Sequence, residues 1–515
     1  MKRYILLPLL AATFAAQAQD SYMNERLTNN SSDVIGTARY VGMGGALGAL
    51  GADMSVISWN PAGIGLYRKN DIALTFGGTW GKSRIDEVDR GKATFDQAGF
   101  VYNIRTGSES CPYVNFAFNF QKKINFNHNF YADNPELRGL SQMDQVAELV
   151  DWDEGWQHNL AGLAFENNYF SSALNEDGNR FCYNDIPSIS NYYTHHSEGS
   201  LQAFDFNLST NINDRAFIGL TVGVDNMLYR GWNIYGEYDL NGVESYNLHN
   251  DIDISGTGVN VKLGTIIRPF EDSPFRFGVA IETPTWYRLR NSTLFFLRDC
   301  ISGKESQELE SYLKFNVRSP WKFRASIGST VGSVLAWDID YEYATYGNNS
   351  ISYPGTGGIK DVEMNNLTRQ NMRGTHTLRV GLEANATKNL AFRLGYNLST
   401  SAYKKNINFD QYWLCSDADN AMDYSTSTSF MRLGTANILT LGMGYHSKSF
   451  YIDLAYKLRN QFADFYAFDT SFAQEGSNSQ FTAMDMNKSL IGATIDPVEV
   501  NLTRHAITCS LGFKF

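Results

Sequence analysis

Two groups of neighbouring residues could do chemistry if the fold oriented them suitably. His195-His196 are candidate ligands for a metal ion or haem, because neutral imidazole binds both. Adjacent residues of an extended segment point to opposite sides, however, and no carboxylate or cysteine nearby completes a ligand set. Tyr445-His446-Ser447 would offer a nucleophile beside a base, but adjacent His and Ser on a strand or turn cannot hydrogen-bond in that manner. We therefore predict no catalytic residue, no metal site and no cofactor, and the protein is not expected to be an enzyme.

A third candidate is the glycine-rich stretch GMGGALGALGAD at 42–53, which precedes NPAG at 60–63. A phosphate-binding loop is not favoured, because the dinucleotide-binding pattern needs its third glycine where Leu47 stands. The apolar run from Val41 to Ala52 is too short for a membrane helix, which takes about 20 residues. Small residues let backbone segments approach closely, and proline fixes a turn. The stretch is therefore predicted to be a plug packed against the wall of a larger structure.

The N-terminus and the composition limit the classes to which the protein can belong. Residues 1–18 (MKRYILLPLLAATFAAQA) have the positive start, apolar run and small-residue cleavage site of a secretory signal peptide, which we expect to be removed. A net charge of −11 and the lack of a Lys/Arg-rich run argue against nucleic acid as a partner. No apolar window of helix-spanning length follows residue 18. The cysteines show neither CxxC spacing nor a disulfide framework: Cys111, Cys182, Cys300, Cys415 and Cys509.

The dominant pattern in the rest of the chain is a period of two. Segments at 114–120, 335–343 and 450–458 alternate large apolar residues with small or polar ones, as strands with one apolar face do. The last segment, 504–515, places Ile507, Cys509, Leu511, Phe513 and Phe515 on one face and Ala506, Thr508, Ser510, Gly512 and Lys514 on the other. One face suits lipid, and the other suits a polar or tightly packed interior.

The pattern gives fourteen segments of roughly 10–15 residues, long enough to cross a bilayer at a tilt. They are 70–81, 95–106, 111–123, 201–213, 215–232, 256–268, 275–288, 320–331, 334–345, 376–386, 389–402, 436–446, 449–460 and 504–515. Short turns alternate with long segments at 124–200, 289–319, 346–375, 403–435 and 461–503. The prediction is an all-β chain: a fourteen-stranded antiparallel transmembrane β-barrel at 70–515 with long extracellular loops. A soluble sandwich also alternates, but its strands are shorter and its connections less unequal.

An even number of strands brings both barrel ends to the short-turn side, so residues 19–69 must lie at the periplasmic mouth or inside the lumen. The run Thr37 to Arg68, directly before the first strand, resembles the N-terminal hatch of the FadL/TodX family of outer-membrane transporters, in particular a branch found in Bacteroidetes. The resemblance implies a fourteen-stranded barrel plugged by a hatch, hydrophobic ligands such as long-chain fatty acids captured at extracellular loops, and lateral exit through the wall. It assigns hatch or gating roles to Gly44, Gly45, Asn60, Pro61, Ala62 and Gly63.

One long loop carries an expected outer hydrophobic site. In SQMDQVAELVDWDEGW (141–156), apolar residues recur at helical spacing and Ser141 can cap a helix with Asp144. The loop either packs on itself or forms a low-affinity ligand site. The residues proposed for that site are Leu140, Trp152, Trp156, Leu163, Phe165 and Phe170.

The expected location is the outer membrane of a Gram-negative cell, as a monomer. The expected partners are a hydrophobic small molecule, outer-membrane lipids and the barrel-assembly machinery, which would recognise the C-terminal Phe515. Two other functions stay open: a barrel component of a type IX protein-secretion machine, and uptake of haem or aromatic compounds. A general polar porin is a weaker alternative.

Overall fold

A single antiparallel sheet closed on itself forms the body of the protein. The computed structural model describes residues 33–81, 91–148, 159–174, 180–270, 272–354, 359–360, 362–405, 428–474, 481 and 487–515. The first barrel strand, β1 (Asp71–Gly81), pairs along its whole length with the last, β22 (Arg504–Lys514). Closure leaves no sheet edge, so the backbone polar groups of the wall bond to one another. In the described part of the chain, no helix is long and apolar enough to cross a membrane.

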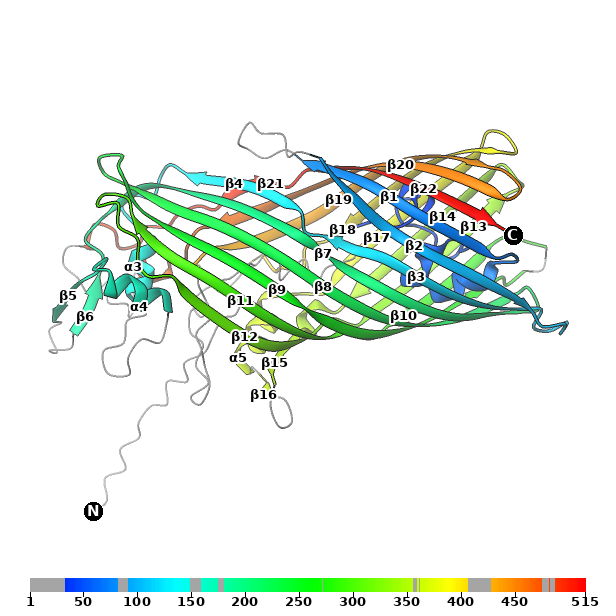
Figure 1. Cartoon of the computed structure of the whole chain (residues 1–515), viewed down its shortest axis with the longest axis horizontal. Helices are drawn as coiled ribbons and strands as arrows, with labels where there is room; N and C mark the ends of the chain where they lie inside the picture. Colours follow the sequence, from blue (N-terminus) through cyan, green and yellow to red (C-terminus); the bar gives the residue numbers. More distant parts are fainter. Residues whose placement is uncertain are drawn as a thin grey trace, which may run out of the picture.

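Fourteen strand positions follow one another round the barrel, which confirms the predicted fold (Figure 1). In order they are β1, β2 (Lys92–Arg105), β3 (Tyr113–Asn125), β7 (Ser188–Ile212), β8 (Ala216–Asp239), β9 (Glu244–Ile267), β10 (Arg276–Glu282) with β11 (Trp286–Asp299), β13 (Lys322–Val331) with β12 (Leu309–Arg318), β14 (Leu335–Ala344), β17 (Thr375–Asn385), β18 (Leu390–Ser399), β19 (Phe430–His446), β20 (Phe450–Tyr466) and β22.

Shorter elements complete the architecture. Six short strands among the described residues lie beside or beyond the barrel strands: β4 (His128–Asn134), β15 (Ser350–Tyr353), β16 (Ile359–Lys360) and β21 (Val498–Asn501), with the hairpin β5 (Ser171–Leu174) and β6 (Arg180–Tyr183) separate from the sheet. The helices are α2 (Ala38–Gly42), η2 (Met54–Ser58), η3 (Pro61–Leu66), α3 (Gln142–Ala147), α4 (Asn159–Glu166), η4 (Tyr346–Asn348), α5 (Val362–Asn371) and η5 (Ser471–Ala473). Figure 1 places α2, η2 and η3 inside the barrel at the end where the C-terminus lies, and α3 and α4 at the opposite end. We call these the turn end and the loop end.

The predicted loop boundaries are partly wrong. β7, β8 and β9 are 24 or 25 residues long and reach far past the segments expected to cross the membrane. The expected loop 124–200 contains β4 and the first half of β7, and the expected loop 289–319 consists largely of β11 and β12. Beyond the lipid-facing zone the outward residues become charged, as at Arg288 and Arg290, while the inward residues become apolar. The alternation continues there, but the apolar residues now face inward and the polar ones outward. Strand ends that are assigned from an outward apolar face are therefore placed too early in the sequence.

Large apolar side chains form a belt on the outside of the barrel. On β9 and β10, for example, Leu263, Ile267, Phe277 and Val279 are 43–60% exposed. A soluble surface rarely exposes so much contiguous apolar area, whereas a wall that faces lipid requires it. Aromatic side chains on the outside, of the kind that line membrane interfaces in such barrels, include Trp321, Tyr341, Tyr343 and Phe515, which are 37–57% exposed. In β22 the predicted inward face is confirmed, since Ser510 and Thr508 are buried and Phe513 is exposed.

Candidate functional site

The lumen is filled in layers, and the hatch is the layer at the turn end. Residues 33–70 form α2, η2 and η3, whose apolar side chains pack into a buried cluster that includes Met43, Leu47 and Val56. Gly44 and Gly45 have φ of +64° and +79°, a backbone conformation that favours glycine. A Cβ atom at Gly44 would lie 2.8 Å from the backbone nitrogen of Tyr396 on the wall. These two predicted gating glycines therefore let the hatch backbone touch the barrel backbone.

Asn60 uses both ends of its side-chain amide, one within the hatch and the other to fasten the hatch to the wall. Its Oδ1 atom accepts a hydrogen bond from the Ala62 nitrogen at 3.2 Å, which caps η3. Its Nδ2 atom donates to the Gly48 carbonyl at 2.9 Å and to the Thr265 carbonyl of β9 at 3.2 Å. The Pro61 carbonyl in turn accepts from the Ser209 hydroxyl of β7 at 2.9 Å.

Ala62 and Gly63 lie in the same short helix. Ala62 is fully buried, and the Gly63 carbonyl accepts a hydrogen bond from the Ala52 nitrogen at 3.0 Å. The motif NPAG thus joins two parts of the hatch to β7 and β9, the two wall strands on either side of β8.

A pair of aspartates on β14 holds the glycine-rich loop, and sequence reasoning missed it. Asp338 Oδ2 accepts hydrogen bonds from the backbone nitrogens of Ala49 at 3.0 Å and Leu50 at 2.8 Å. Asp340 accepts from the nitrogens of Leu47 at 3.2 Å and Gly48 at 3.1 Å. Successive backbone N–H groups that converge in this way form an anion-binding nest. The signal was available, because the outward face predicted for 335–343 leaves Asp338 and Asp340 on the inward face.

A large cavity opens beneath the hatch at the turn end. Its volume is about 670 Å³, and its lining includes Arg39 and Asp53 of the hatch with Glu383 and His446 of the wall. Arg39 Nε lies 2.9 Å from Glu383 Oε2, so an ion pair links the first hatch helix to β17. Burial raises the pKa of Asp53, although the nearby Arg39 and a hydrogen bond from Thr37 oppose this. The cavity is polar, which suits an aqueous mouth rather than an apolar ligand.

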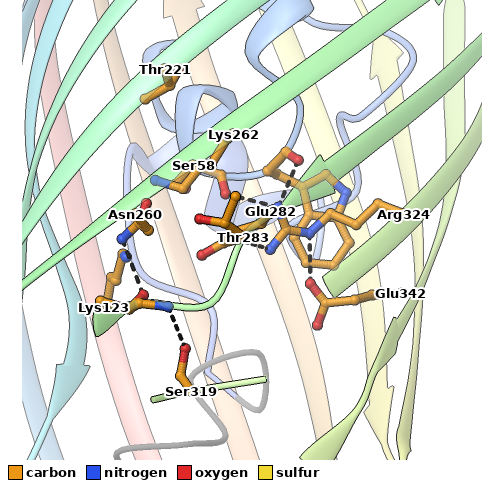
Figure 2. A network of polar contacts seen from close by, with 12 residues as sticks. Ser58, Lys123, Thr221, Asn260, Lys262, Glu282, Thr283, Ser319, Arg324 and Glu342 are labelled. Atoms are coloured by element: carbon orange, nitrogen blue, oxygen red, sulfur yellow. Dashed lines mark hydrogen bonds and ion pairs between the residues drawn. The ribbon is translucent and has the colours of Figure 1, made fainter. Parts of the chain in front are cut away.

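Immediately on the loop side of the hatch, a layer of paired charges crosses the lumen (Figure 2). Arg324 of β13 lies between Glu282 and Glu342, and its guanidinium also donates to the Trp59 carbonyl of the hatch at 3.0 Å. Lys262 lies 2.7 Å from Asp205, and Lys123 lies 2.8 Å from Asp225.

All seven charged side chains of this layer are at least nine-tenths buried. Burying charges is costly unless they are paired, and here each has a partner of opposite sign. The cavity beside the layer has a volume of about 50 Å³, far below the ~300–1,000 Å³ of sites for small organic ligands. This cavity is therefore too small to admit such a ligand beside the paired charges.

Beyond the charged layer, the lumen becomes apolar. One buried cluster there includes Phe126, Met227 and Leu289. A larger cluster at the loop end combines the inner faces of the long strands with α3 and α4, and it contains Leu140 and Leu163, two residues predicted for the outer site. The other described members, Phe165 and Phe170, pack against this cluster. Trp152 and Trp156 lie outside the described residues.

The helix predicted in this loop is present as α3, with its capping box. The Ser141 hydroxyl accepts from the Met143 nitrogen at 3.0 Å, and Asp144 accepts from the Ser141 nitrogen at 2.8 Å. The Ser141 hydroxyl also donates to Glu237 of β8 at 2.6 Å, which ties the helix to the wall. Burial, together with the nearby Glu237, raises the pKa of Asp144 to about 8, although the hydrogen bond from the Ser141 nitrogen opposes this.

Several buried polar groups interrupt the apolar lumen. Asn233 of β8 and Asn250 of β9 are direct cross-strand partners, and Thr293 lies on β11. Their exposed fractions are 4%, 3% and 1%. Among the described residues, neither polar side-chain atom of Asn250 has a hydrogen-bond partner, nor do Asn233 Oδ1 and Thr293 Oγ1. These groups could bind a polar atom of a ligand or an ordered water molecule.

The wall is incompletely paired at one seam. β2 and β3 pair from Arg105↔Tyr113 as far as Gln97↔Gln121. Past this point β2 pairs only with β1 and β3 only with β7, and both of those pairings contain a register shift. Asp96 and Lys122 face each other across the seam at 3.8 Å.

Two observations show at which depth in the membrane this seam lies and which residues lie on its inner side. Lipid-facing phenyl rings lie beside it, with Phe95 and Phe120 stacked at a centroid distance of 5.6 Å, so the seam is at the depth of the apolar belt. On the inner side, Asp33 and Val34 of the hatch line a small cavity together with Asp96, and Lys457 Nζ contacts Asp33 at 2.7 Å and the Val34 carbonyl at 2.8 Å.

No protein-family model matches the sequence. No curated protein matches it either. Among solved structures, that of a Pseudomonas aeruginosa FadL homologue aligns with 94% of this chain and 99% of its own, with a TM-score of 0.51 and 12% identity. The CymD monoaromatic hydrocarbon channel aligns with 94% of this chain and 97% of its own, with a TM-score of 0.50 and 11% identity. The chain has the FadL-type fold.

The FadL-type fold accounts for the architecture but leaves the ligand contacts open. At 11–12% identity the resemblance does not extend to individual side chains. His195 and His196 point to opposite sides of β7 as predicted, since His195 is buried and His196 stacks on Trp232 with ring centroids 5.5 Å apart. His446 contacts Asp453 at 3.1 Å, at the rim of the polar cavity.

Proposed function

We propose that this protein is an outer-membrane transporter that takes up hydrophobic compounds such as long-chain fatty acids. The signal peptide at 1–18 would direct export, and the loop end would face the outside of the cell. The ligand would enter at the apolar cluster around Leu140 and Leu163, descend to the cluster around Phe126, and leave sideways into the membrane. The neighbours of known structure, a FadL homologue and a monoaromatic hydrocarbon channel, support a hydrophobic cargo.

The observation that carries this proposal is the order of the layers in the lumen. The apolar part of the lumen ends at a layer of buried, paired charges, and the hatch lies directly behind it. A hydrophobic molecule that reached this layer would have to displace ion pairs and then cross a polar cavity. The incompletely paired seam between β2 and β3 lies at the depth of the apolar belt and offers a shorter way out.

The hatch would control this exit through Asp33 and Val34. These residues lie beside Asp96 on the inner side of the seam and are held by Lys457. Glycine-rich contacts at Gly44 and Gly45 and the anchor at Asn60 would keep that part of the hatch in place while Asp33 and Val34 move. In this scheme Pro61, Ala62 and Gly63 serve the hatch and do not contact the ligand.

A reversible cross-link across the seam tests the lateral exit. In a variant without native cysteines, Asp96→Cys with Lys122→Cys would be joined by a reducible bifunctional thiol reagent. We expect cross-linking to abolish uptake of radiolabelled oleate by cells and reduction to restore it. The matched control is Thr377→Cys with Ser399→Cys, which face each other on the fully paired seam between β17 and β18. Uptake that continues at the normal rate through a cross-linked β2/β3 seam would refute lateral exit there.

Purification of the protein separates transport from secretion. A transporter purified alone should bind oleate or toluene, and mass spectrometry of its lipid extract should identify a hydrophobic ligand. A stable complex with other proteins after mild detergent extraction, together with no ligand binding, would favour the barrel of a secretion machine.

A further inference from the structure

We propose that the outer face of β11 and β12 binds the phosphate-bearing headgroup of an outer-leaflet lipid. Four cationic side chains gather on this face: Arg288, Arg290, Lys314 and Arg318. All four are exposed and point away from the lumen. Arg290 and Lys314 are direct cross-strand partners. We call these four residues the basic cluster.

The basic cluster has an excess of positive charge. Like charges directly opposite each other destabilise a sheet, and the described residues place no carboxylate within 4.0 Å of any of the four. Two of the four contact neutral groups: Arg290 Nε donates to the Ser255 hydroxyl at 2.8 Å, and Arg318 donates to the Asn348 carbonyl at 3.3 Å. In a chain of net charge −11, such a concentration of cations needs an explanation.

Other exposed arginines on the same wall do have acidic partners. Arg230 of β8 lies 3.3 Å from Asp253, and Arg298 of β11 lies 3.9 Å from Glu305. The nearest outward acids to the basic cluster are on its loop side, because Asp253 is opposite Ser292 in the register of β9 and β11. The side of the cluster that faces the turn end is apolar instead.

The height of the basic cluster points to a lipid headgroup. Trp286 is opposite Arg318 and 52% exposed, and Val259 beside it is 46% exposed. Trp321, which directly precedes β13, is 40% exposed. These residues form the upper border of the lipid-facing belt, so the cations lie where the headgroups of the outer leaflet begin.

The geometry suits phosphate. Residues two apart on one strand face are separated by about 6.6–6.8 Å, and cross-strand partners by about 5 Å. Arg288, Arg290 and Lys314 can therefore reach one phosphate group together, and guanidinium binds phosphate oxygens in pairs. A lipid fits better than a free anion because its acyl chains would lie on Trp286 and the belt below. This inference rests on the membrane orientation proposed above but not on the transported compound.

Titration of the purified barrel in detergent with fluorescent diphosphoryl lipid A tests the proposal. The variant Arg290→Gln with Lys314→Gln should bind this lipid about 25-fold more weakly, roughly fivefold for each cation removed near a headgroup. The matched control is Arg230→Gln with Arg298→Gln, which removes two exposed, acid-paired cations from the same wall and should change the affinity less than twofold. Both pairs are at the surface, and the gel mobility of unheated samples would verify that each variant is folded.

Two competitors identify the source of the phosphate. Dephosphorylated lipid A should compete poorly, and 10 mM inorganic phosphate should displace little of the bound lipid. Equal weakening in both variants, or equal binding of phosphorylated and dephosphorylated lipid, would overturn the proposal. Efficient displacement by inorganic phosphate would overturn the lipid as the occupant. Oleate uptake, measured separately, should be unchanged in the variant Arg290→Gln with Lys314→Gln. A failure of the lipid-binding proposal would therefore not contradict the proposed transport function.

Discussion

Removal of the Asp338 carboxyl group should release the glycine-rich loop of the hatch from the wall. Asp338 is fully buried, and its Oδ2 atom is the acceptor for the backbone nitrogens of both Ala49 and Leu50. In Asp338→Ala both N–H groups lose their acceptor in a buried place. A buried N–H without a partner costs about 1–3 kcal/mol, so the loop should be destabilised by about 2–6 kcal/mol. At ~1.4 kcal/mol per factor of ten, the population of the displaced loop should rise at least 30-fold.

Hydrogen exchange of the amides at 47–50 measures this population directly. The exchange rate in Asp338→Ala should rise by the same factor, because these amides exchange from the displaced loop. Asp338→Asn keeps a carbonyl oxygen at the position of Oδ2 and should exchange within a few-fold of the native protein. Asp251→Ala, which removes an exposed carboxyl on the outside of β9, is the control for an unrelated change of charge. Native protection in Asp338→Ala would show that the carboxyl group does not hold the loop.

Three further outcomes are expected. Asn60→Ala should raise the conductance of the barrel in planar bilayers while leaving assembly intact, because the hatch loses its bonds to Gly48 and Thr265; an unchanged closed state would contradict the anchoring role. Asn250→Leu should raise the free energy of unfolding by about 1 kcal/mol, because it removes a buried amide without partners, and a lower value in urea titrations would indicate a bound water. Asp144 should make the stability of the folded loop depend on pH. Its pKa of about 8 in the folded state is above the ordinary value of about 4. The contribution of Asp144 to stability is therefore largest below pH 4 and is lost as the pH rises to 8. Protease cleavage between β4 and β7 should therefore be faster at pH 8 than at pH 5, and Asp144→Asn should remove the difference.

The strands could be predicted because a membrane barrel repeats one simple rule. Outward residues face lipid and inward residues are small or polar, so Ile507 and Phe513 alternate with Thr508 and Ser510 in β22. This rule holds only within the bilayer. Above it, Arg288 and Arg290 face out while Leu289 faces in, and the same alternation no longer identifies an apolar outer face.

The site could be predicted only where its signal is local. The capping box of Ser141 and Asp144 spans four residues, and so does the NPAG turn, so both can be recognised in the sequence. The contact between Asp338 and Leu50 joins residues 288 apart, and no local pattern reveals it. The alternation of β14 does place Asp338 on the inward face, but it does not say what that carboxyl group binds. The same limit applies to the seam between β2 and β3, which depends on where two pairings end.

In the proposed scheme, the order of the layers also gives the hatch a role besides filling the lumen. Each methylene group of an alkyl chain gains about 0.8 kcal/mol in an apolar site, so a chain of ten would lose about 8 kcal/mol at the charged layer around Arg324. Under the proposed function, a hydrophobic ligand would therefore stop above this layer, next to the seam. On the inner side of the wall there, Asp33 of the hatch contacts Lys457. In this scheme the charged layer would set the depth at which the ligand stops, and the contact between Asp33 and Lys457 would control whether it can leave. Variants of Lys457 should therefore alter the rate of exit, whereas variants of the basic cluster outside should not.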